Sequence, residues 1–503
     1  MVTIFASAER FMGFLYRVYL SRALGPVGLG IYQITLSVVG VLVTLCASGI
    51  PITVSRLMLK ERAKSDRVGE ADVISAGILT SILVSAPIVV VLLLFREKLT
   101  FIFADERCYD VLVIILPGIV LTGVYAVIRG YFWGNRYYLS YSLIEFIEEA
   151  VMVAIGMILV SRATDLFDGA KKAGVAVFIS YIVSFCLSSL VFAVRSGKLT
   201  NPIRKLKPLV VSSSPITVTR TLSSLMGSFV ALILPARLVF YGMTKTQAIS
   251  AFGEMSGMAM PLLFMPSTFI GSIALVLVPE ISDDYYNGRT DELNKNIIKA
   301  FDCCVIISAL VAPVFLGAGK EIGAFIYSSE SAGVYLAVAS FTMFPMSVSM
   351  MTTSLLNSVN KERFTLVNYL IGALFTLLSI IFLPKHMGIY SLIAGYAAGY
   401  IVMSVSNVLM LKRFCKGEFR WLKTLSLSAA ASAAAGVFCY LLTDVFRRFA
   451  PLLITLVLSS VSTVAFTFIL LCVFDVLSAK KLFAFVGKNR KKEKIPDKLP
   501  RKA

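Results

Sequence analysis

Three glutamates lie in the first half of an apolar stretch, SYSLIEFIEEAVMVAIGMILV at 140–160, that is long enough to cross a membrane. Glu145, Glu148 and Glu149 are spaced i, i+3 and i+4, so a helix places them on one face. A charged carboxylate at the bilayer centre costs about 2.5–3.5 kcal/mol on insertion scales, and close carboxylates cannot all ionise without nearby cations. The spacing therefore predicts a face that lines a hydrated cavity, where it balances arginines or binds a coupling H⁺ or Na⁺. No other cofactor is expected.

Four arginines also fall inside apolar segments, and a mid-membrane arginine must face a protein interior or a water-filled cavity. Arg220 is expected about 16 Å into its helix, at 1.5 Å rise per residue. The residues predicted to bind an anionic substrate are Arg10, Arg17, Arg56, Arg220 and the intramembrane acid Glu254. Two alternatives stay open: Arg56 extends to the interface from a helix end, and Arg220 forms a structural ion pair.

The composition says which elements must position these charges. The 503 residues are 57% hydrophobic and only 15% charged, with a mean hydropathy of +0.84, which is typical of a polytopic membrane protein. The eight cysteines form no CxxC pair, and His386 is the single histidine, so no metal site is expected. Short loops without a His/Asp/Glu cluster argue against an enzyme.

The apolar pattern predicts an all-α fold with about fourteen transmembrane helices. The expected helices are 3–21, 30–58, 72–95, 110–133, 139–161, 173–194, 209–235, 247–279, 297–317, 332–356, 364–384, 388–411, 422–442 and 452–475. The expected organisation is an N-terminal lobe of six helices at 1–195, a C-terminal lobe of six at 209–411, an extra helix pair at 422–475 and a basic tail at 476–503. A substrate site between two such halves is typical of transporters.

The distribution of positive charge predicts the orientation. Most of the 48 Lys and Arg residues fall in the loops that lie inside when the N-terminus is inside, so both termini are expected in the cytoplasm of a bacterial cell. The basic tail then lies against anionic membrane lipids, which explains the net charge of +19 better than nucleic-acid binding does.

Several segments resemble one known family. They are RFMGFLYRVYLSRALGPVGLGIYQ (10–33), SGIPITVSRLM (48–58), SSSPITVTRTLSSL (212–225), GEMSGMAMPLLFMPSTFIGSIALVLVPEIS (253–282) and LLNSVNKERF (355–364). In their order and spacing they resemble stage V sporulation protein B-like and polysaccharide biosynthesis membrane proteins, relatives of the lipid II flippases within the multidrug/oligosaccharidyl-lipid/polysaccharide exporter superfamily. The resemblance implies two six-helix lobes around a central cavity, alternating access, functional cavity arginines and an extra helix pair that holds a polyprenyl tail.

Two features depart from the family pattern. Members commonly carry Glu-Gln-x-x-Arg in the fifth helix, and here Glu145 fits while Glu149 replaces the arginine. The first helix also begins later than is usual, so an upstream start or a shortened helix is expected.

The sequence therefore predicts a monomeric flippase that carries a polyprenyl-pyrophosphate-linked saccharide, an oligosaccharide or peptidoglycan precursor, across the cytoplasmic membrane. One alternative is a cation-coupled multidrug antiporter of the same superfamily. Another is a scaffold in cell-wall assembly or sporulation that transports nothing and has structural ion pairs only.

Overall fold

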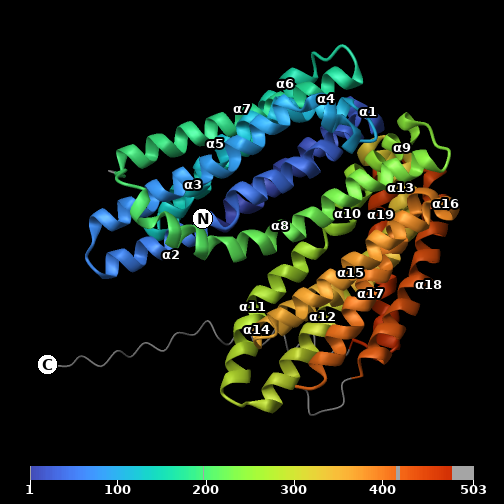
Figure 1. The fold of residues 1–503 in the computed structure, drawn as a ribbon. Helices are drawn as coiled ribbons and strands as arrows, with labels where there is room; N and C mark the ends of the chain where they lie inside the picture. The colour runs from blue at the N-terminus through green and yellow to red at the C-terminus, as the bar shows by residue number, and fades with distance from the viewer. Residues whose placement is uncertain (1, 196, 415–419, 478–503) are drawn as a thin grey trace. The chain divides into compact units, whose positions relative to one another are not determined.

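The structure is a computed structural model that describes residues 2–195, 197–414 and 420–477 (Figure 1). Over these residues the chain consists of helices joined by short turns, and no β-strand is present. The predicted all-α fold is therefore confirmed. From residue 478 onward the predicted basic tail lies outside the described residues. Cys415 also lies outside them.

The contacts within the chain divide it into two compact units, and the first comprises Met1–Pro261, Ile326–Ala332 and Ala373–Gly395. Its long helices are α1 (Val2–Ala47), α2 (Ile50–Ala63), α3 (Arg67–Leu94), α5 (Arg107–Gly134), α6 (Tyr138–Val160), α7 (Leu166–Val194) and α8 (Ile203–Phe240). Shorter elements are α4 (Arg96–Leu99), η1 (Thr100–Ile102), α9 (Lys245–Phe252), the π-helix η2 (Gly253–Ala259), α16 (Pro384–Met387) and η4 (Gly388–Tyr390).

Helix α5 lies at the centre of the first unit. It packs against α1, α2, α3 and α7, while α6 packs against α1 and α7 and α8 runs along α1 and α3 (Figure 1). Apolar side chains fill these contacts, since Val54 of α2, Val73 of α3 and Val127 of α5 have no exposed surface. Burying a side chain of this size stabilises by about 1.5–3 kcal/mol in water, whereas within lipid close packing provides the attraction.

Helix α1 is two helices joined at a sharp break. Gly25 adopts φ 60° and ψ −177°, a conformation that residues with a Cβ rarely take, and Pro26 begins the next turn. The break lets one stretch of 46 residues change direction.

The second unit comprises Leu262–Phe325, Gly333–Gly372 and Tyr396–Ala503, and its described part contains most of α11 to α15 and of α17 to α19. Its elements are α11 (Ser267–Tyr286), α12 (Thr290–Tyr327), α13 (Glu330–Ala339), η3 (Ser340–Thr342), α14 (Met343–Ser358), α15 (Glu362–Phe382), α17 (Ser391–Leu411), α18 (Trp421–Arg447) and α19 (Leu452–Val473). Helix α10 (Met260–Phe264) crosses the boundary between the units, as do the ends of several helices in this list. Helices α18 and α19, the predicted extra pair, pack against each other.

Eleven helices of the described residues are long and apolar enough to cross a membrane, or twelve if the bent pair Lys245–Phe264 and Ser267–Tyr286 is one span. The chain is therefore a multi-pass membrane protein. The predicted count of about fourteen differs at two places. The prediction divides Phe5–Ala63, which is broken at Gly25, into two membrane crossings. The prediction also counts α6 as a crossing, although its three glutamates make this helix less apolar.

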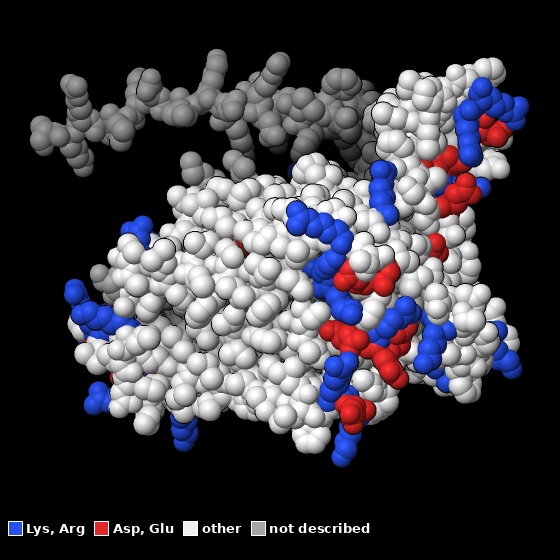
Figure 2. Space-filling model, turned by 90° about the horizontal axis from the view of Figure 1, so that it is seen from above, with Lys and Arg blue, Asp and Glu red and all other residues white. Residues whose placement is uncertain are grey.

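The two predicted six-helix lobes and their boundaries stay predictions, because the contact-based units follow different residue ranges. The surface agrees with a membrane protein. On the face drawn in Figure 2, Lys, Arg, Asp and Glu gather in clusters that are separated by wide uncharged areas.

Candidate functional site

The three glutamates of α6 lie in the first unit, where α6 packs against α1 and α7. Glu145, Glu148 and Glu149 are each only partly exposed, and the helix is continuous through all three. The expected shared face is therefore present, and it is directed at protein neighbours on α1, α5 and α7.

Arg129 of α5 forms an ion pair with this face. Its Nη1 donates a hydrogen bond to Glu145 Oε1 at 3.2 Å, with about a quarter of each side chain exposed. The guanidinium also lies 5.5 Å from the ring centroid of Trp133 and 5.9 Å from that of Tyr125, within range of cation–π attraction. The sequence-based site omitted Arg129, although the spacing of 125, 129 and 133 places these residues on one helical face.

Helix α1 brings further charges to α6. The Glu149 carboxylate lies over Gly13, where a Cβ would come within 2.8 Å of Oε1, so a glycine is needed for this approach. Arg17 is close enough to Glu149 to interact with it electrostatically, and Glu9 interacts in the same way with Glu145 and with its neighbour Arg10. Of the predicted arginines, Arg17 therefore joins the α6 acids, whereas Arg10 is exposed and interacts with Glu9.

Several buried polar atoms beside these charges have no hydrogen-bond partner among the described residues. They are the hydroxyls of Tyr16, Thr122 and Tyr125 and the Nε of Arg129. A buried polar group without a partner costs free energy, so natural proteins usually satisfy such groups with protein, water or ligand atoms. These four atoms belong to α1 and α5, two of the helices that also contribute charged side chains.

Glu254 is placed differently from the other predicted residues. It lies in the π-helix η2, and its Oε1 accepts a hydrogen bond from Ser329 Oγ at 3.0 Å. Single π-helical turns are frequent at functional positions. No contact joins Glu254 to the α6 glutamates within the described structure, so the structure does not bring it to the same cluster.

Arg220 lies halfway along α8 and is exposed, with Nη1 donating to the carbonyl oxygen of Ser48 at 3.3 Å. That carbonyl belongs to the break between α1 and α2, and the next residue, Gly49, is so close to α8 that a Cβ would lie 2.2 Å from Thr217 Oγ1. No carboxylate contacts Arg220 among the described residues, so the structure gives no support to the structural ion pair. Arg56, in the middle of α2, is exposed.

The arrangement has the chemistry of an intramembrane charge cluster. The carboxylates on α6 can bind a proton or a small cation, the arginines on α1 and α5 can neutralise the ionised carboxylates, and Arg220 on α8 can bind an anion. Within the described residues, no group of three or more His, Cys, Asp or Glu side chains could hold a metal ion.

Comparisons with known proteins identify the family. Residues 1–285 match the family described as polysaccharide biosynthesis protein, and residues 258–443 match a family of exopolysaccharide exporters. Stage V sporulation protein B of Bacillus subtilis (strain 168) is 22% identical over 445 residues, 85% of each chain. Lipid II flippase MurJ of the same organism is 21% identical and covers 87% of this chain and 86% of its own length.

Two solved structures share the fold. Lipid II flippase MurJ in an inward closed conformation superposes with a TM-score of 0.73 at 15% identity, covering 94% of this chain and 98% of its own. An inward-facing multidrug resistance MATE family transporter gives a TM-score of 0.65 at 14% identity, covering 81% of this chain and 94% of its own. At these identities the likeness is one of fold.

Proposed function

The chain belongs to the polysaccharide biosynthesis protein family, and from that premise we propose that it carries a lipid-linked oligosaccharide or peptidoglycan precursor across the membrane by alternating access. Its relatives include a flippase, a MATE transporter and a sporulation protein, so the chain is a flippase-type transporter and not an enzyme. The proposed cargo is a polyprenyl-pyrophosphate-linked saccharide, and the proposed location is the bacterial cytoplasmic membrane, with both termini in the cytoplasm and the chain acting as a monomer.

The observation that carries this proposal is the unpaired Arg220. An arginine inside an apolar helix is expensive unless it has a partner, and here its contact in the described structure is one backbone carbonyl, that of Ser48. A guanidinium has five donors in a fixed fork that matches phosphate oxygens, so a pyrophosphate would satisfy it well. Arg10, Arg17 and Arg56 would bind the same anion during its passage.

The α6 glutamates would serve the coupling step. Glu145 is bonded to Arg129, and Glu149 interacts with Arg17, so each acid compensates a cation while the cargo is absent. Arrival of an anion would compete for the arginines, and the displaced carboxylate would take up H⁺ or Na⁺. Glu148 shares their face and would bind the same ion.

The polyprenyl chain would stay in lipid along α18 and α19. Support comes from the apolar side chains that these helices leave exposed, including Val437 and Leu441 on α18 and Val457 and Val461 on α19. An exposed apolar surface of this kind fits an acyl or prenyl chain in a membrane.

A second candidate, a cation-coupled multidrug antiporter, is favoured by one observation. Glu145 of α6 pairs with Arg129, which lies against the rings of Tyr125 and Trp133, and sites with acids and aromatic rings suit organic cations. Arg129 lies within the same cluster and opposes a second cation there, which is why we place this candidate behind the flippase.

The experiment is complementation of a strain depleted of its own lipid II flippase. Wild type is compared with Arg220→Ala, Arg220→Lys and Glu145→Gln at matched membrane levels, and precursor in the outer leaflet is quantified. We expect wild type to restore growth and transport, Arg220→Ala to abolish both, and Arg220→Lys to recover them only in part, because lysine lacks the planar fork.

Lys385→Ala is the matched control, because it removes one exposed cation from the short helix α16. It should transport like wild type. A wild-type chain that moves no precursor but lowers drug accumulation would support the antiporter. A folded Arg220→Ala chain that supports growth and transport fully would mean that the charges are structural, as in the scaffold alternative.

A further inference from the structure

The connector, which we define as residues 197–207 and which includes the first residues of α8, is attached to the rest of the first unit along one side. Thr200 Oγ1 donates to Asp72 Oδ1 at 2.6 Å, and the Thr200 backbone N–H donates to Ser75 Oγ at 2.8 Å. Asp72 is only 1% exposed, so this side of the connector is held by a buried carboxylate of α3.

A second buried carboxylate holds the start of α8. Glu61 of α2 is 5% exposed and lies 2.9 Å from Lys205 Nζ and 3.3 Å from Lys64 Nζ. Removing either partner from a buried pair is strongly unfavourable, so Lys205 is committed to Glu61. The connector therefore has one of its cations neutralised from within the protein.

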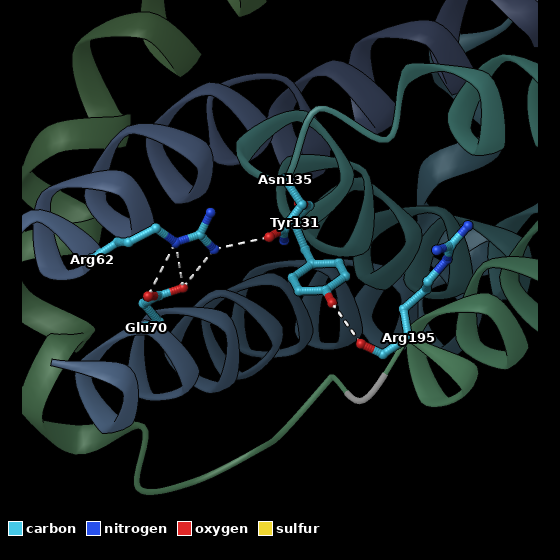
Figure 3. Close-up of polar contacts among 5 residues, drawn as sticks. All are labelled: Arg62, Glu70, Tyr131, Asn135 and Arg195. Atoms are coloured by element: carbon cyan, nitrogen blue, oxygen red, sulfur yellow. Dashed lines mark hydrogen bonds and ion pairs between the residues drawn. The ribbon is translucent and has the colours of Figure 1, made fainter. Parts of the chain in front are cut away.

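The helix ends around the connector are themselves tied together (Figure 3). Arg62 of α2 bonds to Glu70 of α3 at 2.7 Å and to Asn135, just beyond α5, at 2.8 Å. Tyr131 of α5 donates to the carbonyl oxygen of Arg195, the residue that follows α7, at 3.2 Å. These bonds make a platform of four helix ends, and the connector cannot move away from it without breaking buried polar contacts.

The side of the connector that is left exposed is cationic and apolar. Lys198, Arg204 and Lys207 are exposed and have no ion pair among the described residues, while Leu199 and Ile203 are 57% and 74% exposed. The sequence contains no Asp or Glu between 169 and 253, so this stretch of the chain carries no acid of its own.

We propose that this side of the connector, with Lys198, Leu199, Ile203, Arg204 and Lys207, binds the headgroups of anionic phospholipids in the adjacent leaflet. It lies between the ends of two membrane-spanning helices, and therefore at a membrane interface. Basic side chains beside exposed apolar ones are the pattern of an interfacial segment, and each Lys or Arg near an anionic surface adds about 1 kcal/mol of attraction. The platform fixes the connector at that depth, and the inference does not depend on the cargo.

The test uses the full chain in nanodiscs of phosphatidylcholine to which phosphatidylglycerol is added stepwise. Amide hydrogen exchange of 197–211 is the readout. For wild type, protection rises with phosphatidylglycerol, and concentrated salt removes the increase because the attraction is screened. In Lys198→Ala/Arg204→Ala/Lys207→Ala, the phosphatidylglycerol fraction that gives half of the protection rises by at least about tenfold.

The matched control is Arg162→Ala/Lys171→Ala/Lys245→Ala, which removes the same charge at the other end of α7 and at α9, and it retains the wild-type response. Asp72→Asn separates the attachment of the connector to α3 from lipid binding. It lowers the protection of the connector both with and without phosphatidylglycerol. Equal protection of the wild-type connector in both lipids, or a wild-type response in the connector triple variant, would overturn the proposal. If the triple variant fails to fold, the salt titration of the wild type tests the proposal. An increase in protection that concentrated salt does not remove would overturn it.

Discussion

The interaction between Arg129 and Glu145 can be measured with a double-mutant cycle, using Arg129→Gln, Glu145→Gln and the double variant. Polar pairs between transmembrane helices average about 0.6 kcal/mol, with a maximum of about 1.7 kcal/mol. This pair has one bond of 3.2 Å with about a quarter of each side chain exposed, so we expect a coupling energy of about 1 kcal/mol.

The two single variants should lower the free energy of unfolding by different amounts. Arg129 also contacts the rings of Trp133 and Tyr125 at 5.5 and 5.9 Å, and each cation–π contact is worth about 0.5–1 kcal/mol. Arg129→Gln should therefore lower the free energy of unfolding by about 2 kcal/mol, and Glu145→Gln by about 1 kcal/mol. The ring contacts are lost in both Arg129 variants and cancel from the coupling energy.

The assay is reversible unfolding in mixed detergent micelles, with SDS as the denaturant and helix content as the signal. Arg136→Gln, which removes an exposed cation just after α5, is the control and should change stability little. A coupling energy below about 0.3 kcal/mol is within the error of additivity and would show that the two side chains do not interact. Equal losses for the two single variants would refute the contribution of the rings.

Three further predictions follow from contacts outside this pair. Gly49→Ala should lower the free energy of unfolding by about 1–3 kcal/mol in the same assay, because the added Cβ has no room against α8. Ser329→Ala should cost about 0.5–2 kcal/mol, since the hydroxyl accepts a bond from the first turn of α13 and donates to Glu254. Burial alone would raise the pKa of Asp105, but its bonds to Arg107 outweigh burial and lower it below the usual 3.8. The stabilisation is therefore complete well above pH 3.8 and is lost as the pH falls through the lowered pKa, and Asp105→Asn should remove this acid-dependent loss from the unfolding curves.

Features that depend only on neighbouring residues in the chain could be predicted from the sequence. Apolar runs predicted the helices, and the spacing of Glu145, Glu148 and Glu149 predicted their common face, because a helix has a fixed period. The central position of Arg220 also followed from counting along its helix.

The interaction partner of each polar side chain could not be predicted, because the two residues of a pair come from segments far apart in the chain. Arg129 could equally have reached the interface, and only the packing of α5 near α6 makes Glu145 its partner. The sequence predicts that Glu254 binds substrate together with the arginines, whereas in the structure it lies in a π-helix and contacts Ser329. No simple sequence pattern predicts a π-helical turn. Fastening of the connector likewise depends on Asp72, which lies 128 residues before Thr200.

The contacts between α1 and α6 have a consequence for biogenesis. Arg17 enters the membrane with the first helix, whereas Glu149 is synthesised 132 residues later, as their numbers show. Until α6 emerges, the first helix carries charges whose partners do not yet exist, so it is a poor insertion signal on its own. Stable integration of the first helix must therefore wait for α5 and α6, which makes the N-terminal half of the protein assemble as one unit rather than helix by helix.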